Sequence, residues 1–442
     1  MNGPLSTALL AALLPALAAL AFTAPPALLL VADLPLTALQ GQWELNEILF
    51  DPSDLVLAAL LLAFAARGVP RARGGSATVP GLRWWLLLGG LLSIAYLAAP
   101  INAPVLDSWS RIAYQLYRYC WRPIAWFVLA AVCIRDRRRL GWLLAAIVVS
   151  GVIFSLPAIA QGYGGDYATG PFSHKNELGA ALLAPLLLAL AGAVSGRPPG
   201  ARLACGVAAL IIGRALMFAL SRGATVAALA GAALLCAGLL ADRRLRRAVL
   251  TLLPLALLAG VVVLLKSDRP VVAELLTASA GTEDANMQFR IQERWPHFAA
   301  IIAEHPWLGT GDGRDLTLGE EMNTPHNGYL SLALISGIPA ATLTIGFALA
   351  GLAAAWRLQR GADGDLRVLG LAVAATLVAL LIHNLIDATL LNAFAAKVYW
   401  LLIGVTTLAA QQPARFHAAP TAVSPARPRA ALAPAVAVEV RS

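Results

Sequence analysis

Long apolar segments with almost no charged residues recur along the chain, and they constrain its fold more than any other feature. Residues 84–100 and 140–160, for example, contain no charged side chain. An α-helix needs about 20 mostly apolar residues to cross a bilayer. The composition agrees, because only 13% of the residues are charged, whereas about a quarter are charged in a typical soluble domain. A soluble globule is therefore excluded, and we predict an all-α polytopic membrane protein.

The apolar windows predict about twelve transmembrane helices, with charged residues at their ends. The windows are 5–22, 53–66, 84–100, 122–134, 140–160, 177–195, 203–220, 223–241, 248–265, 328–356, 368–386 and 397–410. The stretch 24–36 is apolar but contains Asp33 and is broken by Pro25, Pro26 and Pro35. We interpret it as an extension of the first span or a re-entrant piece rather than a further span.

The first window could instead be a secretory signal, because it ends near the small residues Ala19 and Ala21. A signal peptide begins with a basic region, and no Lys or Arg precedes Arg67. We therefore predict a permanent span. With twelve spans, both termini lie on the same side of the membrane.

Arginine residues gather on one side of the predicted membrane, and this asymmetry predicts the orientation. The loops on that side contain many Arg residues and few acids; they are 67–83, 135–139, 197–202, 243–247, 357–367 and the tail after residue 411. We assign this side to the cytoplasm. These clusters are interpreted as topology anchors that contact anionic lipids, so the net charge of +9 does not indicate a nucleic-acid partner.

Residues 266–327 form one long loop on the outer side, between the ninth and tenth predicted helices. Helical periodicity over 286–304, with an apolar face that includes Trp295 and Phe298, favours an ordered cap over a disordered loop. We predict four parts: transmembrane helices 1–9 over 1–265, the cap over 266–327, helices 10–12 over 328–410, and a disordered cytoplasmic tail over 411–442.

Two arginines in the cap, Arg290 and Arg294, lie four residues apart, so a helix would present both guanidinium groups to one side. In one interpretation they pair with Glu293, with Asp284 or with lipid phosphate. In the other, at least one of them binds a substrate diphosphate, for which the planar fork of donors is suited. Pro296 is expected to start or kink a helix here.

The segment Glu304 to Gly313 is rich in glycine and superficially similar to a phosphate-binding loop. No strand precedes it and no Gly-Lys-Ser follows, so we favour a tight turn that closes the cap. Asp312 and Asp315 are spaced to share a cation, but no His joins them, and the four cysteines have no metal-like spacing. We therefore predict neither a metal site nor a cofactor.

Several polar residues fall where outer loops meet predicted helices. His326 precedes the tenth helix, and an imidazole near a cluster of Arg can take a proton from a hydroxyl while the cations hold an anionic leaving group; the alternative is an interfacial or capping His. Arg222 separates two helices with almost no loop, so it needs an anion. His174 and Lys175 lie at the start of the sixth helix, whereas Arg214, inside the seventh, either snorkels or pairs.

Five short motifs in order resemble those of the O-antigen ligase and polymerase superfamily of bacterial inner-membrane glycosyltransferases. They are His174-Lys-Asn, Ser221-Arg222-Gly223, Arg290 with Trp295, His305-Pro-Trp-Leu-Gly-Thr-Gly311, and Pro325-His-Asn-Gly-Tyr-Leu330 followed by Gly337-Ile-Pro. The resemblance covers residues 170–345 in motif detail; elsewhere it rests on the number of spans and the large outer loop. Pro296, directly after the Trp, departs from the pattern and leaves the aim of Arg294 open.

The resemblance implies a periplasmic glycan transfer from an undecaprenyl diphosphate carrier. It makes His326 the base and Arg222 and Arg290 the diphosphate contacts. Further substrate contacts are expected from Lys175, His174, Arg294, Asn327 and Tyr329. The expected reaction inverts the anomeric centre and needs no metal. We favour the ligase that joins O-antigen to lipid A–core oligosaccharide, since the chain has twelve predicted spans, one dominant outer loop and no added C-terminal domain; a monomer is compatible with this activity.

Other functions stay open on the sequence. An O-antigen polymerase and a protein O-oligosaccharyltransferase use the same donor as the ligase. A lipid-linked sugar flippase is the alternative from another class, but transporters gather charges near the membrane midplane. Here only Arg214 and His383 are expected near the membrane centre.

Overall fold

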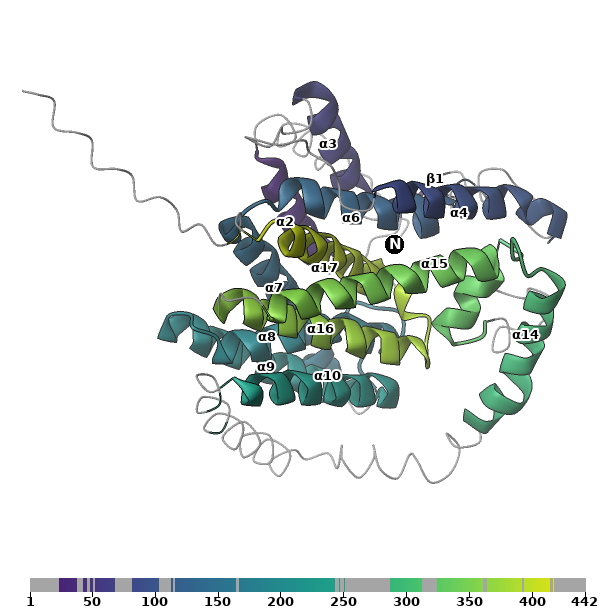
Figure 1. Ribbon diagram of the computed structural model, residues 1–442. Helices are drawn as coiled ribbons and strands as arrows, with labels where there is room; N and C mark the ends of the chain where they lie inside the picture. The colour runs from purple at the N-terminus through teal and green to yellow at the C-terminus, as the bar shows by residue number, and fades with distance from the viewer. Residues whose placement is uncertain are drawn as a thin grey trace, which may run out of the picture.

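The computed structural model describes a helical membrane protein (Figure 1). The described residues are 24–37, 43–45, 48–50, 52–67, 82–102, 113, 116–163, 167–242, 246, 250, 287–311, 324–360, 364–391, 393–413 and 416. The only strands within them are an antiparallel pair of three-residue strands, β1 (Trp43–Leu45) and β2 (Ile48–Phe50). The prediction of an all-α polytopic fold is confirmed.

Seven described helices are long and apolar enough to cross a membrane. They are α7 (Arg137–Gly162), α8 (Lys175–Val194), α9 (Pro199–Phe218), α10 (Arg222–Ala241), α15 (Gly328–Gln359), α16 (Gly364–Asn384) and α17 (Ala393–Gln411). Further helices are α2 (Pro26–Leu36), α3 (Pro52–Arg67), α4 (Leu82–Asn102), α6 (Arg122–Cys133) and α14 (Trp295–Glu304), with short helices η2 (Tyr117–Trp121), η3 (Arg290–Arg294) and η4 (Thr389–Leu391).

Every predicted window that falls on described residues is a helix. The predicted span 5–22 and all of the span 248–265 except residue 250 lie outside the described residues, as do 266–286 and 312–323 of the predicted cap and most of the predicted tail. The predicted total of twelve spans and the extent of the outer loop therefore stay predictions.

Helices α8, α16 and α17 form the centre of the bundle. In their most apolar windows, 72%, 78% and 83% of the residues are buried, against 33% in α9 and in α10. Small residues permit the close packing, as membrane helices require. A Cβ on Gly151 would lie 2.3 Å from Pro185 of α8, and one on Gly404 would lie 2.6 Å from the Phe127 carbonyl oxygen of α6.

The broken stretch 24–36 folds as the single short helix α2, which packs against α7 and α3. At 1.5 Å per residue, its 11 residues span only about 16 Å, too short to cross a bilayer. Its acid Asp33 is fully buried and accepts a 2.7 Å hydrogen bond from Lys397 of α17. The ion pair explains how this segment carries a charge inside an apolar bundle.

The bundle has two chemically different ends. Helices α8, α10 and α15 begin at one end, where α9 and α16 finish, and α14 lies across that end (Figure 1). We call it the site end. At the other, called the opposite end, α7, α9 and α16 begin and α8 finishes. The predicted site residues all belong to elements of the site end.

Candidate functional site

Loops and first turns from five parts of the chain meet at the site end. His174 caps the start of α8, Arg222 is the first residue of α10, and Arg290 lies in η3. His326 comes two residues before α15, and Asp387 follows the end of α16. The site is thus assembled from segments up to 213 positions apart in the sequence, from His174 to Asp387.

The closest pair of titratable groups in the site is His326 and Asp387. The His326 Nδ1 atom lies 3.7 Å from the Asp387 Oδ1 atom, and the two side chains are 31% and 21% exposed. This separation permits an ion pair but exceeds a hydrogen bond. Unliganded sites often show long catalytic contacts that shorten when substrate binds.

The backbone at His326 is unusual, because its φ of 47° lies in the left-handed region. Few non-glycine residues adopt this conformation, and it occurs most often where a neighbouring structure imposes it. The next residue imposes it here: the Asn327 side chain accepts hydrogen bonds from the backbone N–H groups of Tyr329 and Leu330, at 3.0 and 3.2 Å, and so caps α15. With Asn327 capping the helix, the backbone at His326 turns away from the axis of α15.

A tight turn after α16 holds Asp387 in place. The backbone N–H groups of Ile386 and Asp387 both donate to the His383 carbonyl oxygen, at 3.0 Å each. The Ala388 N–H donates to the Asp387 Oδ1 atom at 2.8 Å. Burial alone would raise the pKa of Asp387, but the imidazoles of His326 and His383 and this N–H lower it to about 2. The carboxylate is therefore ionised at neutral pH.

Two arginines approach the same turn. The Arg290 guanidinium donates a 3.1 Å hydrogen bond to the Ile386 carbonyl oxygen, and the Asp387 carboxylate acts on its charge. At Gly223 a Cβ would lie 3.1 Å from the Ile386 side chain, so α10 begins directly against the turn and carries Arg222 with it. Lys175 feels the charges of both Arg222 and Arg290. The site end thus concentrates three cations around one carboxylate.

The first turn of α8 connects His174 to the start of α10. The His174 Nδ1 atom accepts from the backbone N–H of Asn176 at 3.2 Å, and the Ser221 hydroxyl donates to the Asn176 side-chain oxygen at 2.9 Å. Burial lowers the pKa of His174, although Asp387 and Glu177 act in the opposite direction. The Lys175 ammonium lies 5.3 Å from the centre of the Tyr167 ring. The His174-Lys-Asn motif thus positions the start of α8 relative to the start of α10.

Arg294 and Trp295 differ from Arg290 in their surroundings. Arg294 is 5% exposed and its guanidinium lies 5.5 Å from the centre of the Phe289 ring. Both arginines belong to a π-helical turn over Arg290–Arg294. The expectation that both guanidinium groups point to one side stays a prediction. The Trp295 ring N–H donates to the Pro325 carbonyl oxygen at 3.0 Å, and so ties α14 to the His326 loop; Pro296 lies in the first turn of α14, as expected.

The glycine-rich segment docks on a kink in α15. Pro339 lacks an N–H and the Ile338 N–H bonds to Pro306 at 2.8 Å, which frees the carbonyls of Leu334 and Ile335. The N–H groups of Thr310 and Gly311 donate to these carbonyls at 2.7 and 3.0 Å. Because these N–H groups already donate to α15, they do not point at a bound phosphate. The arrangement agrees with the predicted closing turn and disagrees with a phosphate-binding loop.

Two other predicted substrate contacts have structural partners. The Asn327 side chain caps α15, as described above, and the Tyr329 hydroxyl donates to the Leu381 carbonyl oxygen of α16 at 2.9 Å. Arg214 places its guanidinium 4.1 Å from the centre of the Phe218 ring. Arg214 and His383 were expected near the membrane centre. His383 lies in the last turn of α16, and Arg214 lies four residues before the last residue of α9.

Asp387 was not among the residues that the sequence predicted for the site. A signal was present, because His383, Asn384 and Asp387 follow one another at the end of an otherwise apolar window. Asn384 packs closely against its neighbours. Its side-chain oxygen would lie 1.9 Å from a Cβ added to Gly328, and the same oxygen accepts a hydrogen bond from the Leu390 N–H at 3.1 Å. Only the fold reveals that this window finishes beside His326.

Among the described residues, no group of three or more His, Cys, Asp or Glu side chains is arranged to hold a metal ion. Asp312 and Asp315, which the sequence offered as a possible pair, lie outside the described residues.

Comparison with known proteins finds a family model that matches part of the chain. No curated protein matches the chain. The sequence model of the family described as O-antigen ligase matches residues 207–345, which run from the middle of α9 to the middle of α15 and include Arg222, Arg290 and His326. The match agrees with the multi-pass helical fold and with the predicted resemblance. Over these residues the chain is similar to the O-antigen ligase family.

Proposed function

We propose that this protein is an inverting O-antigen ligase. It transfers an O-antigen glycan from undecaprenyl diphosphate to a hydroxyl of lipid A–core oligosaccharide, on the periplasmic face of the bacterial inner membrane. The observation that carries the proposal is the His326–Asp387 pair, at 3.7 Å, beside three cations at one end of the bundle. Both termini are cytoplasmic in this proposal, and the site end faces the periplasm.

The donor diphosphate is assigned to the cations of the site. Arg222 and Arg290 both lie near enough to Lys175 for their charges to act on its ammonium, so an anion that binds beside Lys175 relieves this repulsion. Arg290 presents a planar fork of donors that suits phosphate oxygens. His174 adds a further donor at the α8 start, and the earlier assignments of Arg294, Asn327 and Tyr329 to substrate remain predictions with the structural partners already described.

His326 is assigned the role of base. With Nδ1 towards Asp387, its Nε2 atom is left to accept the proton of the acceptor hydroxyl. Asp387, ionised at neutral pH, stabilises the imidazolium that forms and orients the ring. The oxygen of the acceptor then forms a bond to the anomeric carbon while the bond from that carbon to the diphosphate oxygen breaks.

The leaving diphosphate gains negative charge as the bond breaks, and Arg222 and Arg290 stabilise it. Attack from the side opposite the leaving group inverts the anomeric centre. A diphosphate is already a good leaving group, so positioning and electrostatics supply most of the help that the reaction needs. No step requires a metal ion.

Transfer by purified protein tests the reaction. The full chain, a lipid-linked glycan and lipid A–core acceptor, without an energy source, should yield the ligated product. No product with any acceptor, together with movement of the lipid-linked glycan across vesicles, would favour a flippase. Product formation that survives in His326→Ala would remove His326 from the mechanism.

A deletion strain distinguishes the members of the superfamily. Unmodified core together with polymerised glycan on its carrier supports the ligase. Core that bears a single repeat supports an O-antigen polymerase, and intact lipopolysaccharide with unglycosylated pilin supports a protein O-oligosaccharyltransferase. Complementation with the intact gene restores the missing product in each case.

A further inference from the structure

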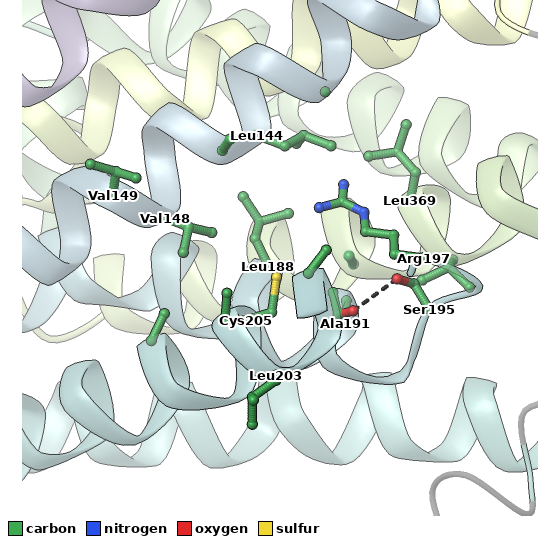
Figure 2. A pocket seen from close by; sticks show the side chains of 18 of the residues that line it. Leu144, Val148, Val149, Leu188, Ala191, Ser195, Arg197, Leu203, Cys205 and Leu369 are labelled. Carbon is green, nitrogen blue, oxygen red and sulfur yellow. Dashed lines mark hydrogen bonds between the residues drawn. The ribbon is translucent and has the colours of Figure 1, made fainter. Parts of the chain in front are cut away.

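A large cavity lies far from the site, at the opposite end of the bundle. It has a volume of about 1010 Å³ and is formed by the first half of α7, the second half of α8, the first half of α9 and the start of α16 (Figure 2). Its lining runs from Arg137 to Ile153 along α7, so it extends from that end towards the middle of the bundle. None of the residues assigned to glycan transfer lines it.

The walls of the cavity are apolar and open towards the hydrocarbon of the bilayer. Leu144, Val148 and Leu188 face one another across it in Figure 2. On its outer edge, Val149 is 50% exposed and Leu203 is 69% exposed. Exposed apolar side chains at a cavity edge, in a membrane protein, contact acyl chains, so lipid has a sideways route into the cavity.

The mouth of the cavity is positively charged. Arg197, in the turn between α8 and α9, extends its guanidinium into the cavity (Figure 2), and Arg137 also lines it. No acidic residue is among the described residues of the lining. α9 begins here without a side-chain cap at Pro198, so the positive end of its helix dipole adds to the same charge. α7 also begins here, but its start is capped by Asp136.

We propose that this cavity binds an anionic phospholipid of the membrane leaflet at the opposite end. The acyl chains occupy the apolar walls, and the head-group phosphate lies between Arg197 and Arg137. A neutral lipid has no net negative charge to match the arginines at the mouth. A free phosphate has no acyl chains to fill the apolar walls. Basic pockets between transmembrane helices bind anionic lipid head groups by the same combination.

A native cysteine provides a probe for the occupant. Cys205 of α9 lines the cavity (Figure 2) and is partly exposed, whereas Cys120 and Cys133 are buried. The only other partly exposed cysteine of the four in the chain is Cys236, so Cys236→Ser leaves Cys205 as the reporter. The measurement is the rate at which N-ethylmaleimide modifies Cys205 in the full-length Cys236→Ser protein, reconstituted in nanodiscs of phosphatidylcholine with or without phosphatidylglycerol of the same chains.

Phosphatidylglycerol is expected to slow the modification about tenfold relative to phosphatidylcholine alone, a factor that corresponds to about 1.4 kcal/mol of differential binding. Arg197→Ala should abolish the difference. Arg360→Ala, which removes an exposed Arg at the same end of the bundle but outside the cavity, should preserve it. Val207→Trp, which places a large ring at the exposed edge of the cavity, should protect Cys205 in both lipids.

Three results would overturn the proposal. Equal rates in the two lipids mean that acyl chains enter without head-group recognition. Protection by undecaprenyl phosphate but not by phosphatidylglycerol assigns the cavity to the donor lipid. A Cys205 that no condition makes reactive means that another segment of this chain fills the cavity.

Discussion

The two ends of the bundle use arginine in different ways. At the site end, Arg290 donates to the carbonyl of Ile386 beside the partly buried Asp387, in a site assembled from five loops and first turns. At the opposite end, Arg137 and Arg197 lie at the mouth of an apolar cavity whose described lining contains no acid. A cation near a fixed anion and a base is suited to chemistry on a charged substrate, whereas a cation above an apolar cavity is suited to an amphipathic ligand.

This difference teaches that arginine count alone does not locate a membrane active site. The sequence places most arginines in the loops of the opposite end, and only a few at the site end. The arginines at the site end differ from the others because they lie near His326 and Asp387, where hydrogen bonds hold the backbone in place. The following experiments test that distinction.

The largest effect is expected from loss of the base. His326→Asn should reduce the transfer rate by about 10³-fold, because general base catalysis contributes roughly 10²–10⁴-fold. Asn tolerates the left-handed backbone at this position, where φ is 47°, so the fold should be preserved. The measurement is kcat/KM for transfer, with the thermal unfolding midpoint as the control for folding. A variant that folds normally and keeps more than a tenth of the activity would contradict the role of His326.

The next effect concerns the cations of the site. Arg290→Lys should lower kcat/KM by roughly 10²-fold, since loss of one donor to a developing charge costs about that much and Lys lacks the planar fork. Arg222→Lys is expected to behave in the same way. The matched control is Arg214→Lys, also at the site end, whose guanidinium lies over the Phe218 ring; its kcat/KM should change by less than about twofold. Equal losses in all three variants would indicate general destabilisation instead.

A smaller loss is expected from Asp387→Asn. Contacting residues couple by about 1–3 kcal/mol, so the transfer rate should fall roughly tenfold to a hundredfold. The reason is that the amide no longer stabilises an imidazolium at His326. Combined with His326→Asn, the substitution should have little further effect on kcat/KM. If the two losses multiply, Asp387 acts independently of His326.

The contact between the glycine-rich turn and the kink in α15 allows a test of stability rather than of chemistry. At Gly337 φ is 76° and a Cβ would lie 2.3 Å from the Trp307 carbonyl oxygen, so Gly337→Ala should reduce the free energy of unfolding by about 1–3 kcal/mol. Gly346→Ala, in the same helix with nothing within 4 Å of the added Cβ, is the control and should have no such effect. Thermal unfolding in detergent measures both, and equal midpoints would show that the docked turn contributes little.

The smallest expected effect is that of a chelator. Transfer by the purified protein should be unchanged in EDTA, because the proposed mechanism uses only cationic side chains to stabilise the leaving group. The measurement is the initial rate of product formation before and after treatment. Loss of activity that a divalent ion restores would contradict the metal-free mechanism and would direct attention to Asp312 and Asp315.

Much of the fold follows from local sequence. The apolar windows predicted helices at every described position, and Pro296 was correctly expected near the start of a helix. The tight turn after His305 was also predicted, because glycines without a preceding strand favour a turn over a nucleotide loop. The π-helical turn over Arg290–Arg294 was not predicted, because no pattern in the sequence indicates it.

The sequence by itself determined that this protein lies in a membrane, which segments form helices, and which few cations and histidines deserve consideration as site residues. These properties depend on hydrophobicity and spacing within one segment. Only the tertiary structure decided that the end of α16 places Asp387 beside His326, and that four helices leave an apolar cavity at the opposite end. Both depend on how helices distant in sequence pack side by side, and that packing is fixed by the shapes of small residues such as Gly223 and Gly151 against their neighbours.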